Sequence, residues 1–259
     1  MKSAKDAIVG EINQLTTGNY SPFANRLVDR DDPRRAVRSA ELLNTEMRSN
    51  LEQRFARRFG VVDPRAIHSI WVKWYVDAIL PPVLLADILL HKTIELSLPG
   101  TEFILAGDGP VDAIKISGAS WSGSKDPFRR FQLIMFDHFA PLIEMWAERT
   151  DVTRRVLWSN VGNVFEAMLR RIETVSGPME RLSEAQLLLD QPDWLGRPNP
   201  LFRSVRYLAR DGQKLRRRRV CCLQYRLPGR HFCAACPVEE GGSPRSKLKG
   251  PLAGGRPSG

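Results

Sequence analysis

The four cysteines of this 259-residue chain all lie in one stretch, residues 216–237, which runs RRRRVCCLQYRLPGRHFCAACP. Their spacing is C-C-x10-C-x2-C, and Pro237 follows the last of them. Four thiols gathered in so short a part of the chain indicate that they act together on one shared group. This stretch is therefore the best guide to both the fold and the function.

Three chemistries use four clustered thiols, and each requires a different spacing. A structural zinc ion is bound by chelating pairs with about two to four residues between the partners, as at Cys233 and Cys236. Cys221 and Cys222 fit zinc poorly, because neighbouring side chains of an extended backbone point to opposite sides. A [2Fe-2S] cluster spreads its thiolates over two irons, so adjacent cysteines can serve different corners. Disulfides require an oxidising compartment, and no signal peptide precedes them. The spacing favours an iron-sulfur cluster over zinc, and zinc over disulfides.

Several local motifs surround the cysteines. Arg-Arg-x-Cys-Cys-Leu-x-Tyr-x-Leu-Pro-Gly contains Cys221, and Cys-x-x-Cys-Pro begins at Cys233. Upstream lie Trp-Ser-Asn-Val-Gly-Asn at residues 158–163 and Asn-Pro-Leu-Phe-Arg-x-Val-Arg at residues 199–206. Together these motifs resemble the ferric siderophore reductases of the FhuF type. The resemblance is strongest over residues 199–237, moderate over 63–190 and weak before that.

The resemblance implies an enzyme, a ferric-siderophore iron reductase. Cys221, Cys222, Cys233 and Cys236 are then expected to hold a [2Fe-2S] cluster, with no catalytic group besides it. The cluster would pass one electron to Fe(III) in a hydroxamate siderophore and so release Fe(II). The expected electron donor is an acidic ferredoxin-like or flavin reductase protein. The expected location is the cytoplasm, with transient contact at the inner membrane as an option.

Four further residues are candidates for binding the substrate: Trp158, Asn160, Asn163 and Arg206. Asparagine is a poor helix former, so two asparagines beside Gly162 within a helical segment predict buried hydrogen bonds or a face for a ligand. A polar packing point between helices explains the same pattern, and the sequence does not separate the two interpretations.

The charge of the chain leaves other functions open. The formal net charge is +10, which predicts attraction to an acidic partner. Arg216, Arg217, Arg218 and Arg219 could favour a reduced cluster, dock an acidic donor or lie in solvent. They could also be the phosphate footprint of an iron-sulfur or zinc-stabilised regulator that binds nucleic acid, although no helix-turn-helix is recognisable. A siderophore-binding or siderophore-assembling protein is a third alternative, since the body also resembles synthetases of carboxylate siderophores.

The rest of the sequence predicts an α+β fold that is mainly helical. We expect a helical body with a small antiparallel sheet over residues 1–190, a short iron-sulfur module over 191–240 and a disordered tail over 241–259. Asp32-Pro33 and Asp63-Pro64 are helix starts, and Gly60 is a helix stop. Further helices are expected at 127–149, 153–175 and 178–189, and strands at 94–98, 102–106 and 111–117. No apolar stretch is long enough to cross a bilayer.

Overall fold

The computed structural model describes residues 7–42, 44–60, 63–107, 109–116, 119–121, 123–210 and 212–238. The helical elements are α1 (Ala7–Leu15), η1 (Gly18–Phe23), α2 (Ser39–Leu42), α3 (Thr45–Phe59), α4 (Pro64–Leu90), η2 (Leu98–Gly100), α5 (Pro127–Arg130), η3 (Leu133–Phe139), α6 (Ala140–Arg149), α7 (Arg154–Ser176), α8 (Glu180–Asp190) and η4 (Gln224–Arg226). The strands are β1 (Leu27–Asp29), β2 (Val37–Arg38), β3 (Lys92–Ile94), β4 (Glu102–Leu105), β5 (Val111–Ile116), β6 (Ala119–Trp121), β7 (Asp193–Trp194), β8 (Arg197–Pro198), β9 (Val205–Arg210) and β10 (Gln213–Arg218). The predicted fold class, α+β and mainly helical, is confirmed.

Helix α4 is the centre of the molecule. It begins where the sequence predicts, because Asp63 accepts a hydrogen bond from the backbone N–H of Arg65 and Pro64 occupies the first turn. The helix continues through Pro81 and Pro82, which lack an N–H and so leave the carbonyls of Asp77 and Ala78 without their usual helical donors. Most side chains from Ala66 to Ile88 are buried, so the other elements pack around α4 on several sides.

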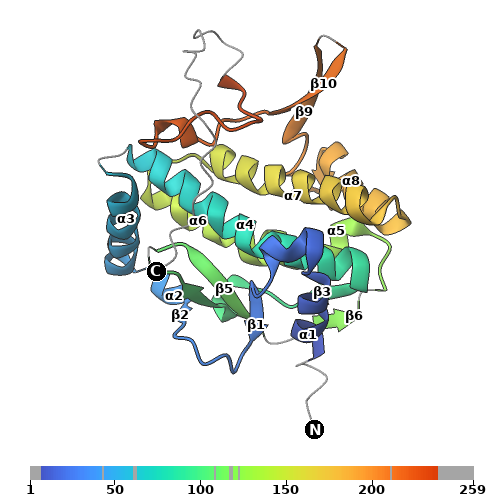
Figure 1. The fold of residues 1–259 in the computed structure, drawn as a ribbon, viewed down its shortest axis with the longest axis horizontal. Helices are drawn as coiled ribbons and strands as arrows, with labels where there is room; N and C mark the ends of the chain where they lie inside the picture. Colours follow the sequence, from blue (N-terminus) through green and yellow to red (C-terminus); the bar gives the residue numbers. More distant parts are fainter. Residues whose placement is uncertain are drawn as a thin grey trace.

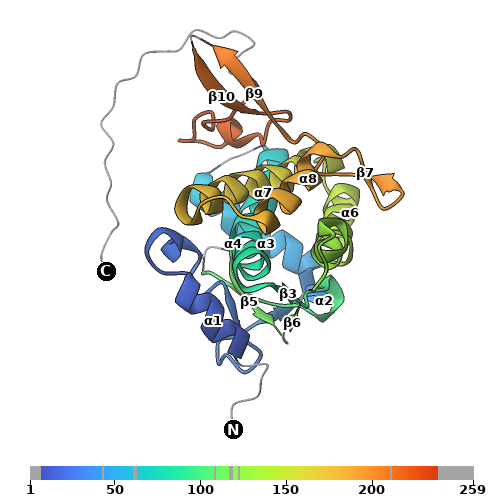
Figure 2. The ribbon, with the colours of Figure 1, turned by 90° about the vertical axis from the view of Figure 1, so that its right-hand side faces the viewer.

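The elements form layers on either side of α4 (Figures 1 and 2). Helix α7 lies alongside α4, and the hairpin β9–β10 with the cysteine stretch lies beyond α7. The sheet with strand order β1-β5-β4-β2 covers the opposite side of α4. One continuous hydrophobic core runs between these layers, and it includes Cys222 and Leu227 of the cysteine stretch.

One prediction for the N-terminal part was wrong, and the predicted antiparallel sheet was incomplete. Asp32-Pro33 does not begin a helix, because Val37 and Arg38 form β2 and pair with β4. The helix begins instead at Thr45, where the side chain of Asn44 accepts from the N–H of Glu46. The sheet also differs from a three-stranded antiparallel one: β4 and β5 pair as expected, but β1 joins β5 in parallel and β3 pairs with β6. Pairing across long sequence separations therefore outweighed the local helix signal.

The later helices agree with the prediction. The stretch 127–149 is helical with a π-helical segment, η3, in its middle, and α7 and α8 follow at the expected places. The tail predicted over 241–259 lies outside the described residues. Within the described part of the chain, none of the helices combines the length and apolar character needed to span a membrane.

Candidate metal centre

The cysteine stretch follows directly from the hairpin β9–β10. The two strands are antiparallel with Val205 opposite Arg218, and β10 leads into Cys221 after two further residues. Leu223, just after the adjacent cysteines, has a left-handed backbone conformation with φ of 63°, so the chain turns sharply there. The short helix η4 then carries the chain round toward Cys233. The turn brings the two halves of the C-C-x10-C-x2-C motif together.

The four sulfur atoms lie as two pairs. Cys221 Sγ is 3.9 Å from Cys236 Sγ, and Cys222 Sγ is 4.0 Å from Cys233 Sγ. Two thiolates on one tetrahedral metal, with bonds of about 2.3 Å, are about 3.8 Å apart. Each pair therefore has the spacing that one metal atom requires. All four thiols are free, and two pairs fit a group with two metal atoms better than a single zinc ion.

The thiols differ in how readily they ionise. The hydrogen bond between Cys222 and Cys233 lowers the pKa of Cys222 against the effect of its burial, and the charges of Arg218 and Lys73 lower it further. The same hydrogen bond raises the pKa of Cys233. Burial raises the pKa of Cys221 to about 11, although the N–H of Leu223 donates to its sulfur at 3.3 Å. Cys222 therefore becomes a thiolate, the form that binds metal, more readily than Cys221 or Cys233.

A buried polar chain connects the cysteine stretch to the two central helices. Ser69 of α4 donates its hydroxyl to the carbonyl oxygen of Cys222 at 2.9 Å. Asn160 of α7 donates its Nδ2 to the carbonyl oxygen of Ser69 at 2.9 Å, and its Oδ1 accepts from Arg218 Nη2 at 2.6 Å. We call Ser69, Asn160 and Arg218 the polar chain. Asn160 is fully buried, so its unusual place in a helix is explained by these hydrogen bonds.

The close approach of α7 to the module depends on Gly162. A Cβ atom added at this residue would lie 2.0 Å from Ser204 Oγ and 2.4 Å from Ser204 Cβ. The hydroxyl of Ser204 donates to the carbonyl of Leu201, and the carbonyl of Ser204 accepts from the N–H of Arg219. The glycine in the sequence Trp-Ser-Asn-Val-Gly-Asn thus allows the segment before β9 to pack against the helix.

The other candidate binding residues lie apart from one another. Trp158 is half-buried and packs against the core, and the backbone carbonyl of Asn163 accepts from Arg216 Nη2 at 3.0 Å. Arg206 is exposed on β9. The structure therefore brings Asn160 to the cysteine stretch but does not assemble Trp158, Asn163 and Arg206 around one cavity, and their role in binding a substrate stays a prediction.

The four arginines before the cysteines have different surroundings. Arg216 forms an ion pair with Glu166 of α7, and Arg217 Nη1 donates to the carbonyl of Ala234 at 3.0 Å. Arg218 is buried, with only 1% of its surface exposed, whereas Arg219 is exposed. Side chains alternate between the two faces of a strand, so Arg216 and Arg218 share one face of β10. The sequence alone could have predicted that these two arginines lie on the same face.

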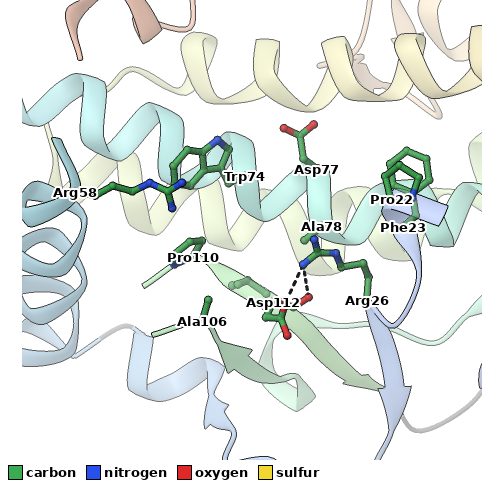
Figure 3. Close-up of a pocket in the computed structure, with 11 residues that line it drawn as sticks. Pro22, Phe23, Arg26, Arg58, Trp74, Asp77, Ala78, Ala106, Pro110 and Asp112 are labelled. Carbon is green, nitrogen blue, oxygen red and sulfur yellow. Dashed lines mark hydrogen bonds and ion pairs between the residues drawn. The ribbon is translucent and has the colours of Figure 1, made fainter. Parts of the chain in front are cut away.

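A pocket of about 460 Å³ lies on the other side of α4, toward the sheet (Figure 3). Its lining residues are Pro22, Phe23, Arg26, Arg58, Trp74, Asp77, Ala78, Ala106, Pro110, Val111 and Asp112. The volume is in the range of small-molecule sites, which are mostly apolar with a few polar groups. The residues come from five separate segments, and no spacing in the sequence indicated that they would meet.

The pocket has both apolar and charged side chains in its lining. Arg26 Nη1 contacts Asp112 Oδ1 at 3.0 Å, and the guanidinium of Arg58 lies 5.0 Å from the centre of the Trp74 ring. Asp77 points away from the sheet, toward α7 (Figure 3). The pocket therefore offers a ligand an apolar surface with an ion pair and one further arginine.

One face of α4 connects the pocket with the cysteine stretch. Ser69, Lys73 and Asp77 follow one another at intervals of four residues and so lie on the same side of the helix. Lys73 Nζ is 3.8 Å from Asp77 Oδ2. The charge of Arg218 lowers the pKa of Asp77, and the charge of Cys222 raises it. At 1.5 Å per residue, Ser69 and Asp77 are about 12 Å apart along the helix axis. The pocket and the cysteine stretch thus both contact α4, on different sides of the helix.

The comparison with protein families agrees with this geometry. The family model described as ferric iron reductase FhuF-like transporter matches residues 69–215, and the FhuF 2Fe-2S C-terminal domain matches residues 218–237. The chain belongs to this family. The second match covers all four cysteines, so the C-terminal module of this family member is a 2Fe-2S domain. The resemblance inferred from the motifs around Cys221 and Cys233 is confirmed.

Individual relatives are more distant. The ferric siderophore reductase of Escherichia coli (strain K12) is 26% identical over 175 residues, which are 66% of this chain and 65% of that protein. The match thus spans slightly less than two thirds of the relative's length. Among solved structures, aerobactin synthetase IucA from a hypervirulent pathotype of Klebsiella pneumoniae is similar with a TM-score of 0.48, 13% identity, and coverage of 59% of this chain and 34% of that one. Its ATP-bound form has a TM-score of 0.47 and 14% identity, with coverage of 59% and 33%.

Proposed function

We propose that this protein reduces the ferric ion of a siderophore complex by one electron and thereby releases the iron. The observation that carries the proposal is the arrangement of the thiols of Cys221, Cys222, Cys233 and Cys236 as two pairs within a matched 2Fe-2S domain. A [2Fe-2S] group on these four thiolates would carry one electron at a time. Each pair of thiolates would hold one iron.

One electron is sufficient for release. Ferric ion is a hard cation, and hydroxamate oxygens bind it far more tightly than they bind the softer ferrous ion. Reduction therefore loosens the metal without breaking a bond of the siderophore. The electron comes from a separate donor, for which we propose an acidic ferredoxin-like or flavin reductase protein because the chain carries a net charge of +10.

We place the siderophore complex in the pocket beside Trp74. Three hydroxamates carry one negative charge each, so their complex with Fe(III) is neutral, whereas a complex with three catecholates is a trianion. The ion pair between Arg26 and Asp112 in the lining engages one of its two arginines, which supports the neutral class over a trianion. The short distance along α4 between Asp77 and Ser69 supports electron transfer without direct contact between the iron and the thiols.

The alternative of a regulator that binds nucleic acid has less support. A phosphate footprint requires exposed, unpaired positive charges. In the described part of the chain, Arg216 is paired with Glu166 and Arg218 is buried. The arginine run is therefore mostly engaged within the protein, and no observation favours nucleic acid over a siderophore.

A visible spectrum of the anaerobically purified protein, with iron, sulfide and zinc analysis, tests the proposal. We expect two irons and two sulfides per chain, bleaching on reduction, and recovery of the colour when a ferric hydroxamate is added in excess. Ferrous ion should appear in step with that recovery, as measured with a ferrous chelator. A colourless protein with one zinc would contradict the proposal, and so would a cluster that does not react with any ferric siderophore.

A further inference from the structure

Arg218 is an unusual residue for the interior of a protein. Its residue surface is 1% exposed, and it is among the largest fully buried side chains of the described chain. Within the described part of the chain, Nη2 is the only guanidinium nitrogen of Arg218 with hydrogen-bond partners, Ser159 Oγ at 3.2 Å and Asn160 Oδ1 at 2.6 Å. The Nε and Nη1 atoms are buried and have no partner among the described residues. Two unsatisfied donors on a buried cation are costly unless something absent from the protein atoms accepts them.

The surroundings of Arg218 indicate what that acceptor is. Its backbone N–H donates to the carbonyl of Ala235 at 2.8 Å, between the two later cysteines. Its positive charge acts on the sulfurs of Cys222 and Cys233, the two members of one thiol pair. Through Asn160 and Ser69 it is also connected to the carbonyl of Cys222. Arg218 is therefore close to the proposed cluster, and its charge acts on the pair formed by Cys222 and Cys233.

The other charges nearby do not replace the cluster as a counter-ion. Lys73 adds a second positive charge that acts on Cys222. The charge of Arg218 acts on the carboxylate of Asp77, but burial raises the pKa of Asp77, and Lys73 Nζ already lies 3.8 Å from Asp77 Oδ2. Ser159 and Asn160 are neutral, so they do not compensate the positive charge of buried Arg218. An anionic cluster of four thiolates and two sulfides would compensate this charge.

We infer that Arg218 is a positioning residue that donates hydrogen bonds from Nε and Nη1 to the sulfur atoms of the cluster and raises its reduction potential. The inference rests on the proposed four-thiolate site. A cluster held by four thiolates is anionic, and its negative charge grows by one when an electron enters. A fixed, desolvated cation with two donors aimed at it stabilises the reduced form more than the oxidised form, because hydrogen bonds to sulfur and net charge set the potential of such groups.

The neighbouring residue supplies a matched control. Arg219 carries the same charge one position along the chain but is exposed, so solvent screens it. We compare the midpoint potentials of the holoprotein and of Arg218→Met, Arg218→Lys and Arg219→Met, measured by redox titration of the visible spectrum. We expect Arg218→Met to hold the electron at least tenfold less tightly, a downward shift of about 59 mV for a one-electron couple. The midpoint potential of Arg218→Lys should lie between those of the wild type and Arg218→Met. Arg219→Met should change the affinity of the cluster for the electron less than twofold.

Equal shifts in Arg218→Met and Arg219→Met would overturn the inference, as would an unchanged potential in Arg218→Met. If Arg218→Met does not assemble the cluster, Ser159→Ala replaces it, because this variant keeps the charge but removes one of the two hydrogen bonds that orient the guanidinium. If the potential of Ser159→Ala falls so that the cluster binds the electron more than twofold more weakly, the role of Arg218 is supported. An unchanged potential rejects that role. Absence of iron and sulfide from the wild-type protein is a different outcome, which rejects the proposed site itself.

Discussion

At the scale of single residues, the thiol pairs make a direct prediction. Cys233→Ser removes one partner of Cys222 and leaves only one complete pair, so the variant should lose most of its iron and sulfide. The loss is measured by metal and sulfide analysis of the anaerobically purified variant. Ala234→Ser is the matched control, because it introduces the same hydroxyl at the next, exposed residue and should retain the cluster. Full iron and sulfide in Cys233→Ser would refute the ligand assignment.

His138 gives a prediction for the pH dependence of stability. It is fully buried, its Nε2 is hydrogen-bonded to the hydroxyl of Tyr75, and burial lowers its pKa to about 3. In the unfolded chain the pKa of histidine is about 6.5. Between these values the unfolded state binds the proton and the folded state does not, so the stability contributed by neutral His138 is complete above pH 6.5 and falls as the pH is lowered.

The variant His138→Gln has no group that titrates in this range. The difference in free energy of unfolding between the wild type and His138→Gln should therefore shrink by about 1.4 kcal/mol for each pH unit below 6.5. Urea unfolding at several pH values down to about 4.5 measures it. A difference that does not change with pH would show that His138 is not kept neutral by burial.

At the scale of elements, the contact between α7 and the segment before β9 depends on a missing side chain. Gly162→Ala places a Cβ atom 2.0 Å from Ser204 Oγ, so we expect the thermal unfolding temperature to fall by several degrees, despite the better helix propensity of alanine. Gly10→Ala in α1 is the control: no atom lies within 4 Å of the added Cβ, and this variant should be as stable as the wild type or more stable.

The double variant Gly162→Ala, Ser204→Gly tests the cause. It removes the two atoms that would clash and leaves Leu201 Cδ2 at an ordinary 3.8 Å. We expect it to recover much of the lost unfolding temperature. If the double variant is no more stable than Gly162→Ala alone, the clash with Ser204 is not the reason for the glycine.

At the scale of the whole molecule, the proposed substrate pocket can be tested separately from the redox chemistry. Ala106 lines the pocket just after β4, and Ala106→Trp should fill much of its volume. We expect this variant to bind a gallium(III) tris-hydroxamate at least tenfold more weakly in calorimetry, because gallium(III) mimics ferric ion but is not reduced. Gln53→Trp, which adds the same side chain to the exposed face of α3, should bind as the wild type does.

The outcomes distinguish two failures. If Ala106→Trp binds the gallium complex as tightly as the wild type, the siderophore binds elsewhere and the reductase function is untouched. If the wild type binds neither the gallium nor the ferric complex, the proposed substrate class is wrong.

The sequence predicts those features that local chemistry determines. Asp63-Pro64 places the start of α4 correctly, since a cap and a proline act within one turn. The cysteine spacing predicts the kind of metal group because ligand geometry limits it. Asp32-Pro33 fails because β2 gains its hydrogen bonds from β4, more than sixty residues away. Alternation along β10 shows that Arg216 and Arg218 share a face, but not that α7 covers this face. The lining of the pocket likewise depends on contacts between distant segments, which a single sequence does not display.

The polar chain has a consequence for the lifetime of the protein in the cell. Ser69 and Asn160 belong to α4 and α7, the two longest helices of the described chain. Asn160 bonds to both Ser69 and Arg218, whose charge the proposed cluster would neutralise. When iron is scarce and the chain is made without its cluster, the uncompensated charge of Arg218 destabilises the interior between these helices. Amide protons of α7 near Asn160 should then exchange with solvent faster in the iron-free protein than in the loaded one. Opening of the interior also exposes the backbone to proteases, so iron-free chains would be degraded first and the surviving population would be enriched in loaded ones.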